Sequence, residues 1–195
     1  MPDGRSRCGW AGREAGMIAY HDTEWGVPVS DDRIHFEFLV LDSFQAGLSW
    51  AVILRKREAF RQAFCELDPV VVSSFNEDDI KRLQGDASIV RNRQKIEATV
   101  SNAARFREIQ EEFGTFDAFI WSFTGGRTVR NRWRRLGEVP AYTRESELMS
   151  KALRARGFRF VGPTICYAYM QGAGIVNDHT TSCFRYEEVN RLARR

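Results

Sequence analysis

The sequence contains no long apolar run, and this absence limits the classes of protein it can encode. No stretch of its 195 residues approaches the ~20 consecutive apolar residues that a membrane-spanning helix needs. Residues 1–10 also lack the apolar segment of a secretory signal. Apolar residues nevertheless make up 43% of the chain and aromatic residues 12%, which argues against a disordered polymer. We therefore expect a soluble, cytoplasmic, globular protein with no membrane partner.

Cysteine and histidine are both scarce. Four cysteines are too few for a disulfide scaffold, and a reducing compartment disfavours disulfides. Cys65 lies at the end of a helix-like run, and Cys166 lies within an apolar run. Both are therefore predicted to be buried packing residues. Cys8 and Cys183 instead each have a histidine near them in sequence. His35 has no such neighbour, and we expect it to be structural.

The Cys and His residues near the two ends of the chain predict a metal site. His179 and Cys183 are separated by three residues, a spacing that lets both bind one ion from a short loop. Cys8 and His21 would complete a Cys₂His₂ set suited to structural Zn²⁺, with no open position for water. Such an ion would couple both ends of the chain to folding. From spacing alone, two unrelated buried cysteines and two surface histidines remain an equal alternative.

Internal repeats, low-complexity linkers and β-strand patterns are missing as well. The one compact β-branched run, Val70–Val72, is too short for a sheet. Apolar spacing and capping signals instead predict helices, and the fold class is all-α. Residues 1–30 and 124–142 show no clear period and are expected to be irregular. The predicted helices run from residue 32 to the break at 47, and over residues 50–64, 77–83, 89–113, 115–123, 145–156 and 164–171.

One acidic residue lies within an apolar helix face. Asp42, in LDSFQAGLSW, is either a helix-end or salt-bridge group or a functional carboxylate kept for its charge. Four aromatic residues, Tyr20, Trp50, Trp10 and Trp25, lie within reach in a compact fold. Together they suggest an aromatic pocket with one anionic acceptor, which suits a flat, electron-poor or cationic ring. An aromatic cluster is more often simply core, and composition does not decide between the two.

The chain is mildly basic, with a net charge of +3. This permits a nucleic-acid partner without demonstrating one. One basic cluster, Arg91, Arg93 and Lys95, opens the second of two predicted helices joined by a tight turn, a geometry that presents positive charge and backbone N–H groups to a phosphate. A second basic cluster runs from Arg127 to Arg135. For both clusters the alternative is a solvated surface.

Several stretches together resemble the bacterial DNA-3-methyladenine glycosylase I family, within the helix-hairpin-helix glycosylase superfamily. The resemblance extends from about residue 7 to residue 183. The matching segments are RCGW (7–10), IAYHDTEWGVP (18–28), FQAGLSW (44–50), IVRNRQKI (89–96), WSF (121–123), SKALRARGFRFVGPTICYAYMQ (150–171) and VNDH (176–179) with Cys183.

The resemblance implies a fold and a cofactor. The chain would form a single glycosylase domain over residues 1–195, with a helical body over about residues 31–175. An arm made of residues 1–30 and 176–195 would be fastened by one structural zinc ion. Its ligands would be the four residues already grouped by spacing. A helix-hairpin-helix element, which we assign to the segment of Arg91, Arg93 and Lys95, would grip the DNA backbone.

The resemblance also implies an activity, namely hydrolysis of the N-glycosidic bond of 3-methyladenine in alkylated double-stranded DNA by a monomeric, monofunctional enzyme. Tyr20 and Trp50 would stack on the extruded base, Trp10 and Trp25 would form walls, and Asp42 would accept hydrogen bonds and stabilise positive charge. The family usually has Glu at the position of Asp42. This departure leaves open a lesion-recognising DNA-binding protein with weak or altered excision. A purine-binding enzyme that does not bind DNA is a more remote alternative.

Overall fold

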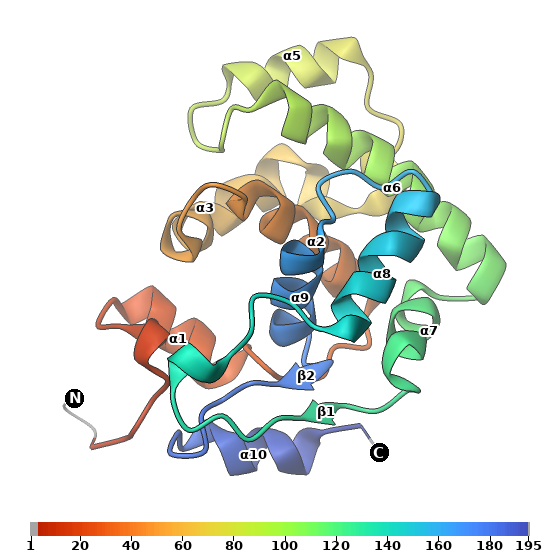
Figure 1. Cartoon of the computed structure of the whole chain (residues 1–195). Helices are drawn as coiled ribbons and strands as arrows, with labels where there is room; N and C mark the ends of the chain where they lie inside the picture. The colour runs from red at the N-terminus through yellow and green to blue at the C-terminus, as the bar shows by residue number, and fades with distance from the viewer. Residues whose placement is uncertain (1–3, 195) are drawn as a thin grey trace.

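The computed structural model describes residues 4–194, most of which lie in helices (Figure 1). The all-α prediction is confirmed. The only strands in the described chain are the two-residue segments β1 (Val129–Arg130) and β2 (Val176–Asn177), which pair in parallel. The helices are α1 (Ala15–Thr23), α2 (Asp32–Gln45), α3 (Trp50–Ala63), α4 (Pro69–Val72), α5 (Glu77–Gly85), α6 (Arg93–Phe113), α7 (Phe116–Trp121), α8 (Arg144–Ala155), α9 (Pro163–Gly172) and α10 (Arg185–Leu192).

Local capping explains where several helices begin. The Asp31 carboxylate accepts hydrogen bonds from two N–H groups of the first turn of α2. Asn76 and Asp79 form a reciprocal capping box at the start of α5, and Thr143 caps α8. The predicted helix at residue 89 begins later, at Arg93, because the Asn92 side chain caps it and residues 90–92 are not helical, with the Asn92 N–H donating to the Val90 carbonyl.

Helices α1 and α10, like the one-turn α4, lie in segments for which the sequence predicted no helix. On α1 the adjacent residues Tyr20 and His21 are both buried. Tyr20 faces a cavity and His21 faces a cluster of Cys and His side chains, so the helix has two buried sides and no single apolar face. On α10, Tyr186 and Val189 are the buried positions.

Helix α2 runs through the centre of the molecule and is buried from His35 to Phe44. Helices α3, α6, α7 and α9 pack around it, and Figure 1 shows α2 and α9 together at the centre. Its phenylalanines join the aromatic core, where Phe36 lies 5.2 Å from Phe106 between ring centroids. Charged residues of α2 are therefore forced into the interior. Of these, Glu37 pairs with Arg57 and Arg61 of α3.

The buried histidine of α2 has the structural role predicted from the sequence. The two ring nitrogens of His35 are hydrogen-bonded to the Asp117 carboxylate and to the Tyr169 hydroxyl, at 3.0 and 2.6 Å.

Cys166 is buried, as expected, but the prediction for Cys65 is wrong because that side chain is exposed. Cys65 begins three consecutive residues in left-handed conformations, which turn the chain after α3 and bring only Leu67 to the core.

The N-terminal segment of the described chain contacts the C-terminal segment. The Phe184 N–H donates to the Ser6 carbonyl at 3.0 Å. Arg194 donates to the Asp117 carboxylate and to the Val29 carbonyl. No helix of residues 4–194 is both long and apolar enough to cross a bilayer.

Candidate functional site

A cavity of about 530 Å³ lies between α1, α2, the start of α3, α9 and the loop at residues 136–141. The structure brings to it all five residues that the sequence analysis grouped as a pocket, namely Asp42, Tyr20, Trp50, Trp10 and Trp25. These five side chains come from residues 10–50, and most of the rest of the lining comes from residues 136–141, 164–171 and 178–180, so the cavity requires the complete fold.

The aromatic side chains form a continuous wall. The ring centroids of Tyr20 and Trp50 are 5.3 Å apart, and those of Trp10 and Trp25 are 4.8 Å apart with an interplanar angle of 70°. Trp10 also lies 6.2 Å from Tyr20, which links the two pairs. Faces of electron-rich rings attract cations and stack on planar heterocycles. The wall therefore favours a flat ligand that carries positive charge.

Asp42 lies at the same cavity as the aromatic wall, and one of its carboxylate oxygens can still accept a hydrogen bond. It is 4% exposed, and burial raises the pKa of its carboxyl group well above the ordinary value of 3.8. Its Oδ2 atom has no hydrogen-bond partner. Among the described residues only four buried side-chain polar atoms lack a partner, and three of them, Trp10 Nε1, Asp42 Oδ2 and Trp50 Nε1, belong to residues that line the cavity. Because buried polar groups are normally paired, this concentration indicates a ligand site.

A second carboxylate at the cavity, Asp178, was not assigned a role from the sequence. It accepts four hydrogen bonds, from Asn131 Nδ2, Trp133 Nε1, Tyr167 OH and Gln171 Nε2, at 2.5–2.8 Å. All its acceptor capacity is thus used inside the protein. Asp178 therefore anchors the 131–133 segment to α9, whereas Asp42 is open to a ligand. The sequence signal that could have revealed it is the VNDH segment.

The cluster of Cys8, His21, His179 and Cys183 has the geometry of a metal centre. All four side chains are buried, and their ligand atoms lie within 4.8 Å of one another. Cys183 Sγ is 3.4 Å from His21 Nε2 and 3.5 Å from His179 Nδ1, and Cys8 Sγ is also 3.5 Å from His179 Nδ1. Tetrahedral zinc with ordinary Zn–S and Zn–N bonds separates its S and N ligands by about 3.6 Å. The structure thus brings together the four residues grouped from the sequence.

Partners of the outer ring nitrogens orient both histidines. His21 Nδ1 is 2.8 Å from Asp22 Oδ1, and His179 Nε2 is 3.0 Å from the Trp25 carbonyl oxygen. A carbonyl or carboxylate in this position requires an N–H, so the other ring nitrogen carries the lone pair toward the cluster. Gly26, in a left-handed conformation, is also required here. A Cβ at that position would lie 3.2 Å from His179 Nε2.

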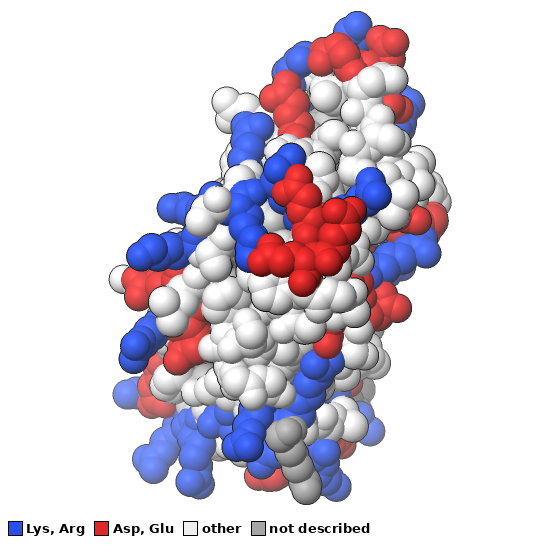
Figure 2. Space-filling view, turned by 90° about the vertical axis from the view of Figure 1, so that its right-hand side faces the viewer, with Lys and Arg blue, Asp and Glu red and all other residues white. Residues whose placement is uncertain are grey.

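The basic residues of the α5–α6 hairpin are not equivalent. Lys95 is only 7% exposed, and its ammonium group donates to the carbonyls of Phe44 and Ala46 at the C-terminal end of α2, which removes it from the predicted phosphate contacts. Arg91 and Arg93 are both exposed, and Arg93 pairs with two glutamates, Glu77 and Glu97, of the same hairpin. Figure 2 shows one face of the molecule, on which acidic side chains gather among basic ones.

Comparison with known proteins is consistent with these features. A family profile described as "Methyladenine glycosylase" matches residues 10–186. DNA-3-methyladenine glycosylase 1 of Escherichia coli (strain K12) is 45% identical over 180 residues, which cover 92% of this chain and 96% of that protein.

Solved structures agree. A crystal structure of 3-methyladenine DNA glycosylase I superposes with a TM-score of 0.90 at 44% identity, covering 92% of this chain and 98% of the other. A second structure, of a variant of 3-methyladenine DNA glycosylase I in complex with 3-methyladenine, gives a TM-score of 0.89 at 31% identity, with 91% and 96% covered. The aromatic cavity with its unpaired acid and the agreement in sequence and fold over nine tenths of the chain lead to one conclusion: the chain belongs to the methyladenine glycosylase family.

Proposed function

We propose that the protein hydrolyses the N-glycosidic bond that joins 3-methyladenine to deoxyribose in alkylated DNA. The observation that carries the proposal is the buried Asp42 carboxyl group, whose Oδ2 has no partner and which lies in a cavity walled by tryptophans and a tyrosine. Relatives with this activity in their names match nearly the whole chain. The base must leave the stack to enter such a cavity.

Charge selects the substrate. A purine methylated at N3 is cationic in DNA, whereas adenine is neutral. Burial disfavours the charged form of Asp42 in the free protein. A cationic base supplies the missing counter-charge, so Asp42 ionises and accepts a hydrogen bond from the base. A neutral base offers no such compensation, and the pocket therefore discriminates by charge as well as by shape.

The chemistry requires little acid catalysis. When the bond between C1′ and N9 breaks, its electron pair passes to the cationic purine, which leaves as neutral 3-methyladenine. Water then adds to C1′ and loses a proton. Tyr20 and Trp50 hold the base by stacking, Trp10 and Trp25 enclose it, and Asp42 stabilises the positive charge that develops on the sugar. Among the described residues, no lysine lines the cavity, so we expect no covalent amine intermediate and no strand cleavage.

Asp42 is one methylene shorter than the glutamate usual in the family. Without a compensating backbone shift its carboxylate would lie roughly 1.5 Å further from the base. The unpaired Oδ2 shows that the shorter side chain still ends in the cavity without an internal partner. Asp42→Glu tests how far the surrounding structure compensates: a large gain in excision rate would show that the shorter acid limits catalysis.

We further propose that Cys8, His21, His179 and Cys183 hold one structural zinc ion. A set of two thiolates and two imidazoles is suited to four-coordinate zinc and leaves no position for a catalytic water. The ion would join residues 1–30 and 176–195 into one arm and position the N-terminal wall of the cavity, because Trp10 lies two residues after Cys8 and its ring centroid is 5.3 Å from that of His21. The whole chain would then act as a single domain.

Double-stranded DNA would contact two helical hairpins. The first is α5–α6, with Arg91 exposed beside its turn. The other is the α8–α9 hairpin. Helix α9 begins beside the cavity, since Thr164 in its first turn lines the cavity wall. Gly162 provides no side-chain cap to α9, so N–H groups of its first turn are available to a phosphate. We expect a monomer to be sufficient for binding.

Release of the free base tests the proposal. Purified protein is incubated with DNA methylated by an alkylating agent, and the released bases are separated by chromatography. We expect 3-methyladenine in the soluble fraction and none with Asp42→Asn. A protein that binds the DNA tightly but releases no base would be a lesion-binding protein instead. Affinity that does not fall as salt increases would argue against phosphate contacts altogether.

A further inference from the structure

Residues 130–133 form an extended chain with two chemically different sides, and a bend at residues 134–135 follows it. The backbone N–H groups of Val129 and Asn131 donate to the C-terminal segment that contains β2, and the Trp133 carbonyl accepts from the Thr181 N–H. Side chains of an extended chain alternate between its two faces. Asn131 and Trp133 point inward, where both donate to Asp178.

The opposite face of this segment carries Arg130 and Arg132, and Arg134 follows in the bend. Arg130, Arg132 and Arg134 are all exposed, and none has an ion pair or a side-chain hydrogen bond within the described chain. Some exposed arginines elsewhere are paired, as Arg93 is with two glutamates and Arg82 with Asp79, whereas Arg91 is exposed without a partner among the described residues. Three unpaired guanidinium groups on one edge are therefore a concentrated positive charge without an internal partner.

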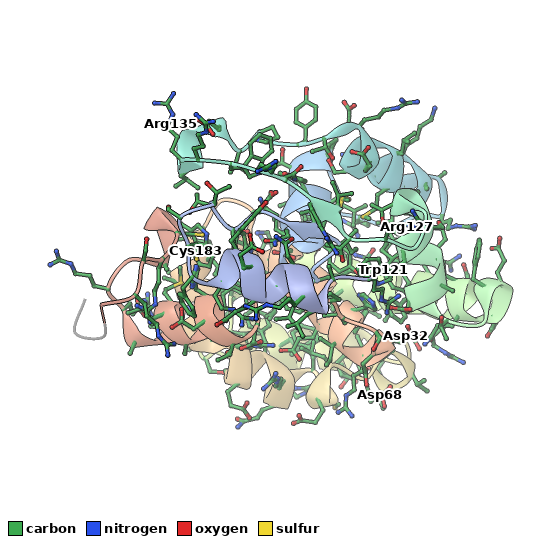
Figure 3. The ribbon with its side chains drawn as sticks, turned by 90° about the horizontal axis from the view of Figure 1, so that it is seen from below. Asp32, Asp68, Trp121, Arg127, Arg135 and Cys183 are labelled. Carbon is green, nitrogen blue, oxygen red and sulfur yellow. The ribbon has the colours of Figure 1, made fainter. Side chains whose placement is uncertain are left out.

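The same segment leads directly to the cavity mouth. Leu136, Val139, Pro140 and Ala141 all line the cavity, and they follow the arginines without a break. Figure 3 labels both ends of the basic segment, Arg127 and Arg135, and places Arg135 at the outer edge of the molecule. The inner face of the segment is fixed to Asp178, so the outer face is presented from a rigid support.

We infer that Arg130, Arg132 and Arg134 form a phosphate-binding strip that holds the DNA backbone beside the extruded nucleotide. The inference rests on the proposed function, since it places the strip at the rim of the base pocket. Alternate residues on one face of an extended chain, here Arg130 and Arg132, repeat at about 6.6–6.8 Å, which is comparable to the separation of successive phosphates along one DNA strand. The chemistry of the partner is thus a row of phosphates. Because guanidinium groups bind phosphate without reading a base, the strip would add affinity and register but no sequence preference.

A charge-matched pair of variants tests the strip. The first variant carries Arg130→Gln, Arg132→Gln and Arg134→Gln. The control carries Arg33→Gln, Arg105→Gln and Arg191→Gln, which removes the same net charge from surface positions that do not line the cavity. The probe is a duplex that contains one tetrahydrofuran abasic-site analogue, and binding is measured by fluorescence anisotropy over a range of salt concentrations.

Three lost phosphate contacts should reduce the slope of log K against log salt by about 2.7, since each contact contributes about 0.9. The control should keep the slope of the unmodified protein. A third variant, with Arg130→Lys, Arg132→Lys and Arg134→Lys, should keep that slope too, because a phosphate contact needs mainly the charge. The single-turnover excision rate at saturating protein should not change in any variant, since the arginines do not touch the base.

Equal slopes for the strip variant and the control would overturn the inference. Arg132→Gln alone, the least disruptive change, should lower the slope by about 0.9, and an unchanged slope there would count against the strip equally. Failure of the proposed function would look different. In that case the unmodified protein itself would release no 3-methyladenine, whatever the slopes of the variants.

Discussion

Replacing Asp42 with Asn should change the stability of the protein in a way that depends on pH. The carboxyl group is buried, its pKa is raised by that burial, and its Oδ2 has no partner. Between the ordinary value of 3.8 and the raised pKa, the folded state binds a proton that the unfolded state has lost. Stability therefore decreases as pH rises through this window. An asparagine side chain does not titrate, so residue 42 of the Asp42→Asn variant contributes no decrease in stability as pH rises.

The magnitude follows from the linkage. At a pH well below 3.8 the side chain is neutral in both proteins, and the two should have similar free energies of unfolding. Above it, the variant should gain about 1.4 kcal/mol relative to the unmodified protein for each pH unit, until the pH reaches the raised pKa. For a chain of this length, 1 kcal/mol corresponds to about 2–4 °C in Tm, so the gap in Tm should widen by about 3–5 °C per pH unit.

The assay is thermal unfolding of both proteins at matched pH values between about 4.5 and 8, followed by circular dichroism. Every other titratable group is common to the two proteins, so the difference between their Tm values isolates residue 42. The same preparations are assayed for release of 3-methyladenine, which the substitution should abolish. Parallel Tm curves across the range would refute the reasoning, because they would mean that Asp42 is ionised at no cost or is satisfied by a partner. A variant that is more stable and inactive would show that the acid is retained for function.

Other predictions concern the metal cluster, the α2 terminus and one glycine. Metal analysis should find one zinc per chain, and Cys183→Ser should lose the metal and lower Tm by about 10 °C or more, whereas the exposed Cys65→Ser should leave zinc content and Tm unchanged. Lys95→Met should leave the Phe44 and Ala46 carbonyls without a donor and displace the end of α2, which we expect to lower the excision rate by about 10–100-fold at unchanged zinc content. Equal rates would remove Lys95 from any positioning role. Gly174→Ala should destabilise by about 3 kcal/mol or more, because φ is +68° and the new Cβ would lie 2.4 Å from the Pro28 nitrogen. The control, Gly125→Ala, has a φ of +63° with nothing within 4 Å, and should cost only about 1–2 kcal/mol in denaturant unfolding.

The sequence by itself determined the features that depend on residue type and short spacing. Capping residues such as Asp31, Asn76 and Thr143 mark helix starts because their side chains bond N–H groups only two or three residues away. The Cys and His residues of the candidate metal site were grouped from their spacing because few residue types bind zinc and the chain contains few of them, although spacing alone left unrelated cysteines and histidines as an equal alternative. The all-α fold class follows from the apolar period.

Tertiary structure alone decided which buried charged groups have hydrogen-bond or ion-pair partners. Glu37 and Asp42 are both acids in the buried part of α2, and nothing local separates them. Two arginines of α3 reach Glu37, whereas Oδ2 of Asp42 meets only the cavity. Lys95 looked like a surface cation from its neighbours, yet it lies against the end of α2 because that helix, far earlier in the chain, ends there with carbonyls that need a donor. Burial and pairing arise from contacts between distant segments, and these are fixed only when the chain has folded around α2.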